Sequence, residues 1–294
     1  MDIVTYDRLN LKNSVVALGK FQGLHRGHML LIDEVLRISS QNHFKGVVLT
    51  INMREDKVIN LSKERYSLLE DMGIDVVAEC EFTKAFASMT PEIFVKSILI
   101  DRLGATCVVV GSDFRFGCKR QGDVELLKSF GDKYGFDVVA FGKLTIDGKV
   151  VSTSYIRELI YSGEVSLVNK FMGRPYMLSG KVLRGKQLGR TIGFPTANIL
   201  PCDLKLLPPF GAYYTKVIVD DKEYKAITNI GNNPTVNDSN LVTVESHLFD
   251  YDGELYDKDI TVMFMDFIRE EKKFISVDEL KNQLILDKNF VLHQ

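Results

Sequence analysis

The segment Ser14-Val-Val-Ala-Leu-Gly19, continued by Lys-Phe-Gln-Gly-Leu-His25-Arg-Gly-His28, decides the fold of the first half of the chain. Its apolar run predicts a buried strand, and residues 28–38 bunch their apolar side chains on one side, as an amphipathic helix does. A glycine-rich turn therefore joins a strand to a helix. Ligands of open α/β sheets bind at the carboxyl ends of strands, so this turn is the first candidate binding site.

The alternation of strand and helix continues through the first half. Apolar runs predict strands over 46–51, 76–78, 106–110 and 136–141, and the segments between them predict helices over 62–72 and 123–134 and from Thr90. Thr90-Pro91-Glu92 has the N-cap, first-position proline and acidic residue that are typical of a helix start. Such alternation implies parallel pairing with right-handed crossovers, so we expect an α/β, Rossmann-like open parallel sheet over residues 1–172.

The alternation of predicted strands and helices ends at about Phe171. Short strand candidates crowd together over 180–183, 213–219, 224–229, 243–249 and 260–267, with Asp-rich turns between them. Close spacing predicts a small antiparallel barrel or sandwich over residues 173–294. A C-terminal helix follows, with Ser276 as N-cap and Glu279 at N3.

Composition narrows the class of protein. The 294 residues hold 37 Lys and Arg against 39 Asp and Glu, and this balance argues against a nucleic-acid or membrane partner. No apolar run approaches the roughly 20 residues of a membrane span, and the start resembles no secretory signal. The four cysteines form no C-x-x-C pair, which excludes a zinc ribbon. We expect a cytoplasmic protein of small-molecule substrates, with its oligomeric state left open.

The turn after the first strand has the composition of a phosphate site. Glycines let a ligand approach the backbone, and a helix N-terminus offers N–H groups to an anion. His25 and His28 bracket Gly27, so both imidazoles can face one phosphate. The alternative is a glycine-rich turn with two surface histidines. On the first interpretation, nucleotide contacts come from residues of the turn: Gly19, Phe21, Gly23 and Gly27.

The string H-x-G-H resembles the signature of the adenylyl- and cytidylyltransferase superfamily. The resemblance implies that His25 and His28 are catalytic, contacting nucleotide phosphates while a substrate phosphate attacks the α-phosphorus of ATP with Mg²⁺ present. A second signature of that superfamily resembles Ser152-Thr153-Ser154-Tyr155-Ile156-Arg157. Ser152, Thr153 and Arg157 would then bind phosphate, although a Ser/Thr run before a helix is alone more often an N-cap.

The loop Gly111-Ser-Asp113-Phe114-Arg-Phe116-Gly also resembles a loop of that family, at the end where flavin and nucleotide bind. Asp113 and Phe114 are the candidate flavin contacts. The alternative is that the loop aromatics fill the core.

A second constellation lies in the other half, as Gly185-Lys-Gln-Leu-Gly189-Arg190-Thr-Ile-Gly193-Phe-Pro195-Thr196-Ala-Asn198. This string is similar to the riboflavin kinase family, as are the segments 209–213, 229–235 and 244–250. Together the two halves resemble the bacterial bifunctional riboflavin kinase and FAD synthetase family. The resemblance implies an ATP-dependent enzyme that makes FMN from riboflavin in the second domain and FAD from FMN in the first.

The resemblance also implies roles for single residues. Thr196 and Asn198 would coordinate Mg²⁺, and Glu245 would be the general base on the terminal hydroxyl of the ribityl chain, with a strand-face salt bridge as the alternative. Nucleotide contacts would come from Gly185, Gly189, Arg190, Gly193 and Pro195. Flavin contacts would come from Asn229 and Arg269, although Arg269 also fits a solvated charge run. Nothing in the sequence assigns chemistry to His43, His247 and His293.

The chain departs from the family pattern in its first half. The family usually has aspartate at the position of Gln22, and it usually carries T-F-x-P-H-P where this chain has Thr50-Ile-Asn-Met-Arg-Glu55. Arg54 is a candidate replacement for a lost positive group. We therefore expect FAD synthesis that is slower than FMN synthesis. The alternatives are a kinase with a silent transferase half, or a flavin-sensing regulator, against which an intact Glu245 argues.

Overall fold

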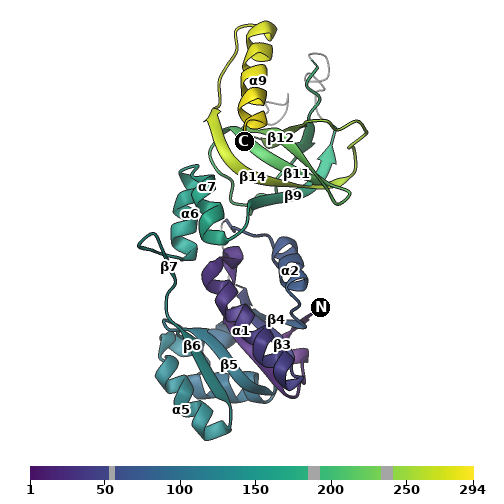
Figure 1. Cartoon of the computed structure of the whole chain (residues 1–294). Helices are drawn as coiled ribbons and strands as arrows, with labels where there is room; N and C mark the ends of the chain where they lie inside the picture. Colours follow the sequence, from purple (N-terminus) through teal and green to yellow (C-terminus); the bar gives the residue numbers. More distant parts are fainter. Residues whose placement is uncertain (53–56, 185–192, 233–240) are drawn as a thin grey trace. The chain divides into compact units, whose positions relative to one another are not determined.

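The computed structural model describes residues 1–52, 57–184, 193–232 and 241–294. Contacts within the chain divide it into two compact units, Met1–Thr153 and Ser154–Gln294. Figure 1 shows a sheet flanked by helices in the first unit and a barrel with a long terminal helix in the second. In the described part of the chain, no helix combines the length and the apolar character that crossing a membrane requires.

The first unit is built on a six-stranded parallel sheet with the strand order β1-β4-β3-β2-β5-β6. The strands are β1 (Asp2–Thr5), β2 (Ser14–Gly19), β3 (Lys45–Asn52), β4 (Val76–Glu81), β5 (Ala105–Gly111) and β6 (Asp137–Phe141). Successive residues of β2 point to opposite faces, and the two faces pack into separate hydrophobic clusters, with Val16 in one and Val15 in the other. A parallel sheet covered on both faces needs continuous apolar strands, which is the pattern of these runs.

Helices connect the strands. They are α1 (Arg26–Asn42), α2 (Ser62–Asp71), α3 (Lys84–Ala87), α4 (Pro91–Phe94) and α5 (Val124–Tyr134), with a π-helical segment η3 (Val95–Ile100) after α4. Short 3-10 turns lie at η1 (Tyr6–Arg8), η2 (Gln22–Leu24) and η4 (Cys118–Arg120), and a small hairpin pairs β7 (Thr145–Ile146) with β8 (Lys149–Val150). The expected Thr90 N-cap is confirmed, since its hydroxyl accepts from the Ile93 N–H at 3.3 Å. The predicted open parallel sheet is also confirmed, and only the exposed edge strand β1 was missed.

The second unit contains a closed barrel with the order β10-β13-β12-β11-β14-β9, in which every pair is antiparallel. Its strands are β9 (Tyr176–Leu183), β10 (Ala197–Ile199), β11 (Gly211–Val219), β12 (Lys222–Asn232), β13 (Val242–Leu248) and β14 (Asp259–Glu270). The sequence left barrel and sandwich open, and the structure selects the barrel. It also adds β10, whose three residues are too few for a periodicity argument.

The terminal helix α9 (Val277–Leu292) begins as expected. The Ser276 hydroxyl accepts from the Glu279 N–H at 3.1 Å. The Glu279 carboxylate accepts from the N–H of Ile275 at 2.9 Å, one residue earlier than in the usual capping box. Both ends of the cap are therefore satisfied, and the predicted helix start is confirmed.

Two helices precede the barrel, α6 (Thr153–Tyr161) and α7 (Val165–Met172). Asn169 on α7 donates its amide to the carbonyl of Phe264 on β14 at 2.8 Å and accepts from the N–H of Tyr176 on β9 at 2.7 Å. Residues 154–172 thus belong to the compact unit of the barrel, whereas the sequence places the domain boundary between Met172 and Gly173. That boundary stays a prediction.

The boundary predicts a difference between two fragments. A fragment of residues 154–294 should be more stable than one of residues 173–294 by about 1–3 kcal/mol, because the shorter one lacks both Asn169 hydrogen bonds, worth roughly 0.5–1.5 kcal/mol each. Urea denaturation of the two fragments measures this. Asn169→Ala in the longer fragment is the matched variant and should lose part of the same stability, because it removes both hydrogen bonds and keeps α6 and α7. Equal stabilities would show that α6 and α7 are dispensable to the barrel.

Candidate active sites

The turn after β2 has a strained backbone. Phe21 and Leu24 have φ values of 50° and 40°, in the left-handed region that residues with a Cβ rarely adopt, and Gly23 has φ 79°. Both non-glycine side chains are fully buried at 0% exposure. Phe21 and Gly23 do not line the cavity described below. The Phe21 ring packs against the ring of His28 instead. From the sequence we expect Phe21 and Gly23 to contact the nucleotide, and this contact stays a prediction.

The two histidines of the turn lie against each other. Their rings stack with centroids 3.6 Å apart and an angle of 13° between planes. Nδ1 of His25 accepts from the His28 N–H at 3.3 Å, so His25 is the N-cap of α1. A Cβ on Gly27 would lie 3.3 Å from the His25 ring, a tight contact. The glycine between the histidines therefore lets the rings stack.

A cavity of about 300 Å³ lies at the carboxyl ends of β2, β5 and β6. The expected residues that line it are Gly19, His25, Gly27, His28, Asp113, Phe114, Ser152 and Thr153. The Thr153 hydroxyl donates to the carbonyl of Gln22 at 3.3 Å, which ties the second predicted signature to the first. Arg157 lies further along α6, in the second unit, and its role stays a prediction. Arg54 lies outside the described residues.

The rim of this cavity carries a cation that the sequence did not indicate. Lys143, in the loop after β6, forms an ion pair with Asp113 at 3.1 Å, and both side chains are largely exposed. Phe114 lines the cavity and stacks on the buried Phe116, with ring centroids 5.7 Å apart. The alternative role as a core aromatic therefore applies to Phe116, whereas Phe114 faces both the core and the cavity.

The barrel places its polar residues in one row across five strands. Glu245 on β13 pairs directly with Asn198 on β10 and with Asn229 on β12. Ala212 on β11 pairs with Asn229 and with Arg269 on β14. Directly opposed residues of an antiparallel pair project from the same face with Cβ atoms about 4.5–5.5 Å apart. The strand register thus brings together residues that the sequence separates by up to 71 positions.

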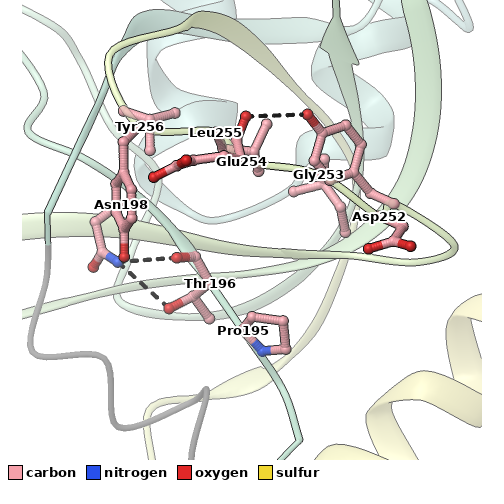
Figure 2. A pocket seen from close by; sticks show the side chains of 11 residues that line it. Pro195, Thr196, Asn198, Asp252, Gly253, Glu254, Leu255 and Tyr256 are labelled. Carbon is pink, nitrogen blue, oxygen red and sulfur yellow. Dashed lines mark hydrogen bonds between the residues drawn. The ribbon is translucent and has the colours of Figure 1, made fainter.

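Two cavities open on this row. One, of about 230 Å³, is lined by Asn229, Glu245, Arg269 and apolar residues that include Phe194 and Ile227. The other, of about 310 Å³, is lined by Pro195, Thr196, Asn198 and the loop between β13 and β14 (Figure 2). Thr196 lines both cavities, so it is their common wall.

The side chains of Thr196 and Asn198 suit a hard cation. Nδ2 of Asn198 lies 3.3 Å from the carbonyl and 3.4 Å from the hydroxyl of Thr196, and the dashed lines of Figure 2 mark both contacts. The amide nitrogen therefore faces Thr196, and the metal-ligand role expected of both residues stays a prediction. Neutral oxygen donors fit Mg²⁺ bound to nucleotide phosphates. Gly193, with φ 85°, supplies the backbone freedom before them, and Gly185, Gly189 and Arg190 lie outside the described residues.

Arg269 links the barrel to α9. Its guanidinium reaches the carboxylate of Asp287 with Nη2 at 2.8 Å and Nε at 3.1 Å, and Asp287 is only 2% exposed. The amide of Gln283 also donates to Asp287 at 2.9 Å. The alternative of a solvated charge run therefore does not describe Arg269, whose guanidinium is paired with a buried carboxylate. Its predicted flavin contact remains a prediction, because Arg269 also lines the smaller cavity.

His247 lines the same cavity, although the sequence assigned it no chemistry. Its Nδ1 donates to the carbonyl of Pro195 at 2.8 Å, and its ring packs 5.0 Å from that of Phe194. The side chain thereby holds the segment that carries Thr196. Strand alternation already placed His247 on the face of Glu245, and this was the signal that could have identified it.

The comparisons with known proteins match both halves of the chain. The family described as FAD synthetase matches residues 7–155, and the family described as riboflavin kinase matches residues 172–293. The bifunctional riboflavin kinase/FMN adenylyltransferase of Buchnera aphidicola subsp. Schizaphis graminum is 32% identical over 95% of this chain and 93% of its own length. Its counterpart in Bacillus subtilis is 34% identical over 94% of this chain and 90% of its own length.

A solved structure extends the comparison to the fold. The crystal structure titled macrolide-efflux protein from Streptococcus pneumoniae matches with a TM-score of 0.90 at 28% identity, covering 100% of this chain and 99% of that chain. The two matched families and these relatives define a two-domain transferase. This chain belongs to the family of bifunctional riboflavin kinase/FMN adenylyltransferases, as the resemblance indicated.

His247 predicts a pH dependence of stability. Burial lowers the pKa of His247, so the unfolded chain binds a proton near pH 6.5 that the folded chain takes up only at lower pH. The free energy of unfolding should therefore decrease as the pH falls below about 6.5. Uptake of one proton changes it by at most about 1.4 kcal/mol per pH unit, and we expect a smaller slope because His247 is only half-buried. Urea denaturation at several pH values measures this.

His247→Gln should show a shallower loss than the wild type over the same pH range, because the amide keeps a donor for Pro195 and does not titrate. His293→Gln, a change at the exposed C-terminus, is the matched control. Parallel curves for His247→Gln and wild type would contradict the prediction.

Proposed function

We propose that this chain phosphorylates riboflavin to FMN in its barrel and adenylylates FMN to FAD in its parallel-sheet unit, with ATP as the donor in both reactions. The observation that carries the proposal is the row of Asn198, Glu245 and Asn229 across β10, β13 and β12. It sets one carboxylate between two amides, beside one apolar cavity and one polar cavity that share Thr196.

The kinase reaction follows from that arrangement. Riboflavin occupies the cavity of Phe194 and Ile227, with its terminal ribityl hydroxyl at Glu245, and ATP occupies the cavity of Thr196 and Asn198. Glu245 accepts the hydroxyl proton while the oxygen attacks the terminal phosphorus of ATP, and ADP leaves. Thr196 Oγ1 and Asn198 Oδ1 would hold Mg²⁺, which supplies neutralisation of phosphate charge. A carboxylate is a weak base for an alcohol, so its placement matters more than its basicity.

The adenylyl transfer uses the other unit. A phosphate oxygen of FMN attacks the α-phosphorus of ATP, and pyrophosphate leaves. No protein nucleophile is required, so the residues act by position and charge. His25 and His28 would hold the phosphates at the N-terminus of α1, and Ser152 and Thr153 line the same cavity, with the Thr153 hydroxyl 3.5 Å from Nε2 of His25. Here too, Mg²⁺ would accompany the nucleotide.

The kinase assignment predicts the effect of Glu245→Gln. The change keeps the shape and removes the basic oxygen, so riboflavin should still bind while FMN formation falls about 10² to 10⁴-fold. Separation of flavins by chromatography measures the rate, and flavin fluorescence measures binding. Glu223→Gln removes an exposed carboxylate paired with Lys216 and is the matched control. Near-normal turnover of Glu245→Gln would exclude this residue as the base.

The adenylyltransferase assignment predicts two rates in one preparation. FAD synthesis should be present but slower than FMN synthesis, because loss of one positioned donor costs about 10² to 10³-fold. His28→Ala should lower FAD formation further and leave FMN formation unchanged, with His293→Ala as the matched control. Equal wild-type rates would show that the departures at Gln22 and over residues 52–54 are harmless. Absence of FAD in a chain that makes FMN would leave a kinase alone.

A further inference from the structure

A buried arginine lies behind the turn that carries the two histidines. Arg65, on α2, is 3% exposed. Its Nη2 donates to Oδ1 of Asn52 at 3.1 Å and lies 3.4 Å from the hydroxyl of Tyr66, while its Nη1 lies 3.4 Å from the carbonyl of Lys20. Arginine is almost never buried without partners. Besides Tyr66 on its own helix, Arg65 therefore contacts the last residue of β3 and the first residue after β2.

Asn52 and Tyr66 connect the guanidinium of Arg65 to the carboxylate of Glu79. Nδ2 of Asn52 donates to Oε1 of Glu79 at 2.9 Å, and the Tyr66 hydroxyl donates to the same oxygen. Burial raises the pKa of Tyr66, so this hydroxyl keeps its proton and remains a donor. Asn52 thus accepts from a cation with one atom and donates to an anion with the other, which orients the guanidinium toward Lys20.

The carbonyl of Lys20 is the link to the active site. It also accepts from the hydroxyl of Thr50 at 3.3 Å, so side chains from β3 and α2 hold one peptide. The next residue is Phe21, whose backbone is left-handed and whose ring packs 5.2 Å from that of His28. The peptide that Arg65 holds therefore sets the position of Phe21, and Phe21 supports His28.

Thr50 matches the threonine of the T-F-x-P-H-P pattern and Asn52 takes its variable position, so both contacts lie beside the residues that depart from the pattern. We propose that Arg65, oriented by Asn52, is a positioning residue for adenylyl transfer, because it fixes the Lys20 peptide and with it the turn that presents His28. This inference rests on the proposed function of the first unit. Arg65 acts through the backbone, in a different way from the direct donor expected at Arg54, and the Arg54 expectation stays a prediction because that residue lies outside the described residues.

The test uses the full-length chain, supplied with FMN and ATP for one assay and with riboflavin and ATP for the other. Arg65→Met keeps the apolar stem and removes every donor, and it should lower kcat for FAD formation about 10- to 100-fold, since small misplacements cost rates of this size. The kinase rate and the KM of the kinase for ATP should stay unchanged. Arg65→Lys should recover little, because one ammonium cannot serve Lys20 and Asn52 together.

A second pair of variants tests the orientation by Asn52 and does not depend on the folding of Arg65→Met. Asn52→Asp places a carboxylate against Glu79 and should lower kcat for FAD formation. Adding Glu79→Gln restores a donor to the new carboxylate, and the double variant should recover most of the loss. Arg37→Met removes an exposed arginine paired with Glu34 on α1 and is the matched control, with no expected effect.

The outcomes are separable. A wild-type chain that makes no FAD overturns the proposed function, and this inference with it. Wild-type FAD synthesis that Arg65→Met and Asn52→Asp leave within twofold overturns this inference alone. Equal losses of the two activities, with a lowered unfolding temperature, also overturn it, because they would show a role in folding only. Loss of kcat for FAD formation with rescue by Glu79→Gln supports it.

Discussion

The backbone of the turn from Phe21 to Leu24 is the constraint on which the first site depends. Residues with a Cβ in the left-handed region cost about 1–3 kcal/mol each, and this turn contains two of them. Full burial of a phenylalanine or leucine side chain is worth about 1.5–3 kcal/mol, so the hydrophobic contacts of these two residues offset a strain of similar size. Side chains then fix the carbonyls of Lys20 and Gln22. The position of the stacked rings of His25 and His28 therefore depends on the conformation of this turn.

In the barrel, strand register positions the polar side chains of the site, and no strained backbone is needed. Closure pairs both edges of every strand, so a residue's neighbours are set by hydrogen bonding on two sides. Glu245 has an amide on each side because β10 and β12 pair with β13 at that level. A slip of one residue in either pair would turn the amide to the opposite face. The hydroxyls of Thr215, Thr228 and Ser246, 2.7 and 2.8 Å apart, form a buried ladder across three neighbouring strands.

Local patterns were enough to predict most of the fold and part of each site. Apolar runs located the central strands, cap residues located the starts of α4 and α9, and the spacing of His25 and His28 indicated their shared cavity. Contacts between distant segments were not predictable. Arg65 and Asn52 are ordinary polar residues 13 positions apart, and the bond from Arg269 to Asp287 needs the tertiary placement of α9. His247 had the right strand face but no signal of its partner Pro195.

The division into two compact units has a consequence for how the chain changes over generations. Each unit has its own buried residues, and substitutions without shared partners have nearly additive effects on stability. Selection can therefore relax on one unit while it maintains the other. The departures from the family pattern, at Gln22 and within residues 51–55, lie in the sheet unit, whereas the row through Glu245 lies in the barrel. Substitutions in the buried part of the first unit are therefore expected to have little effect on the buried contacts of the second.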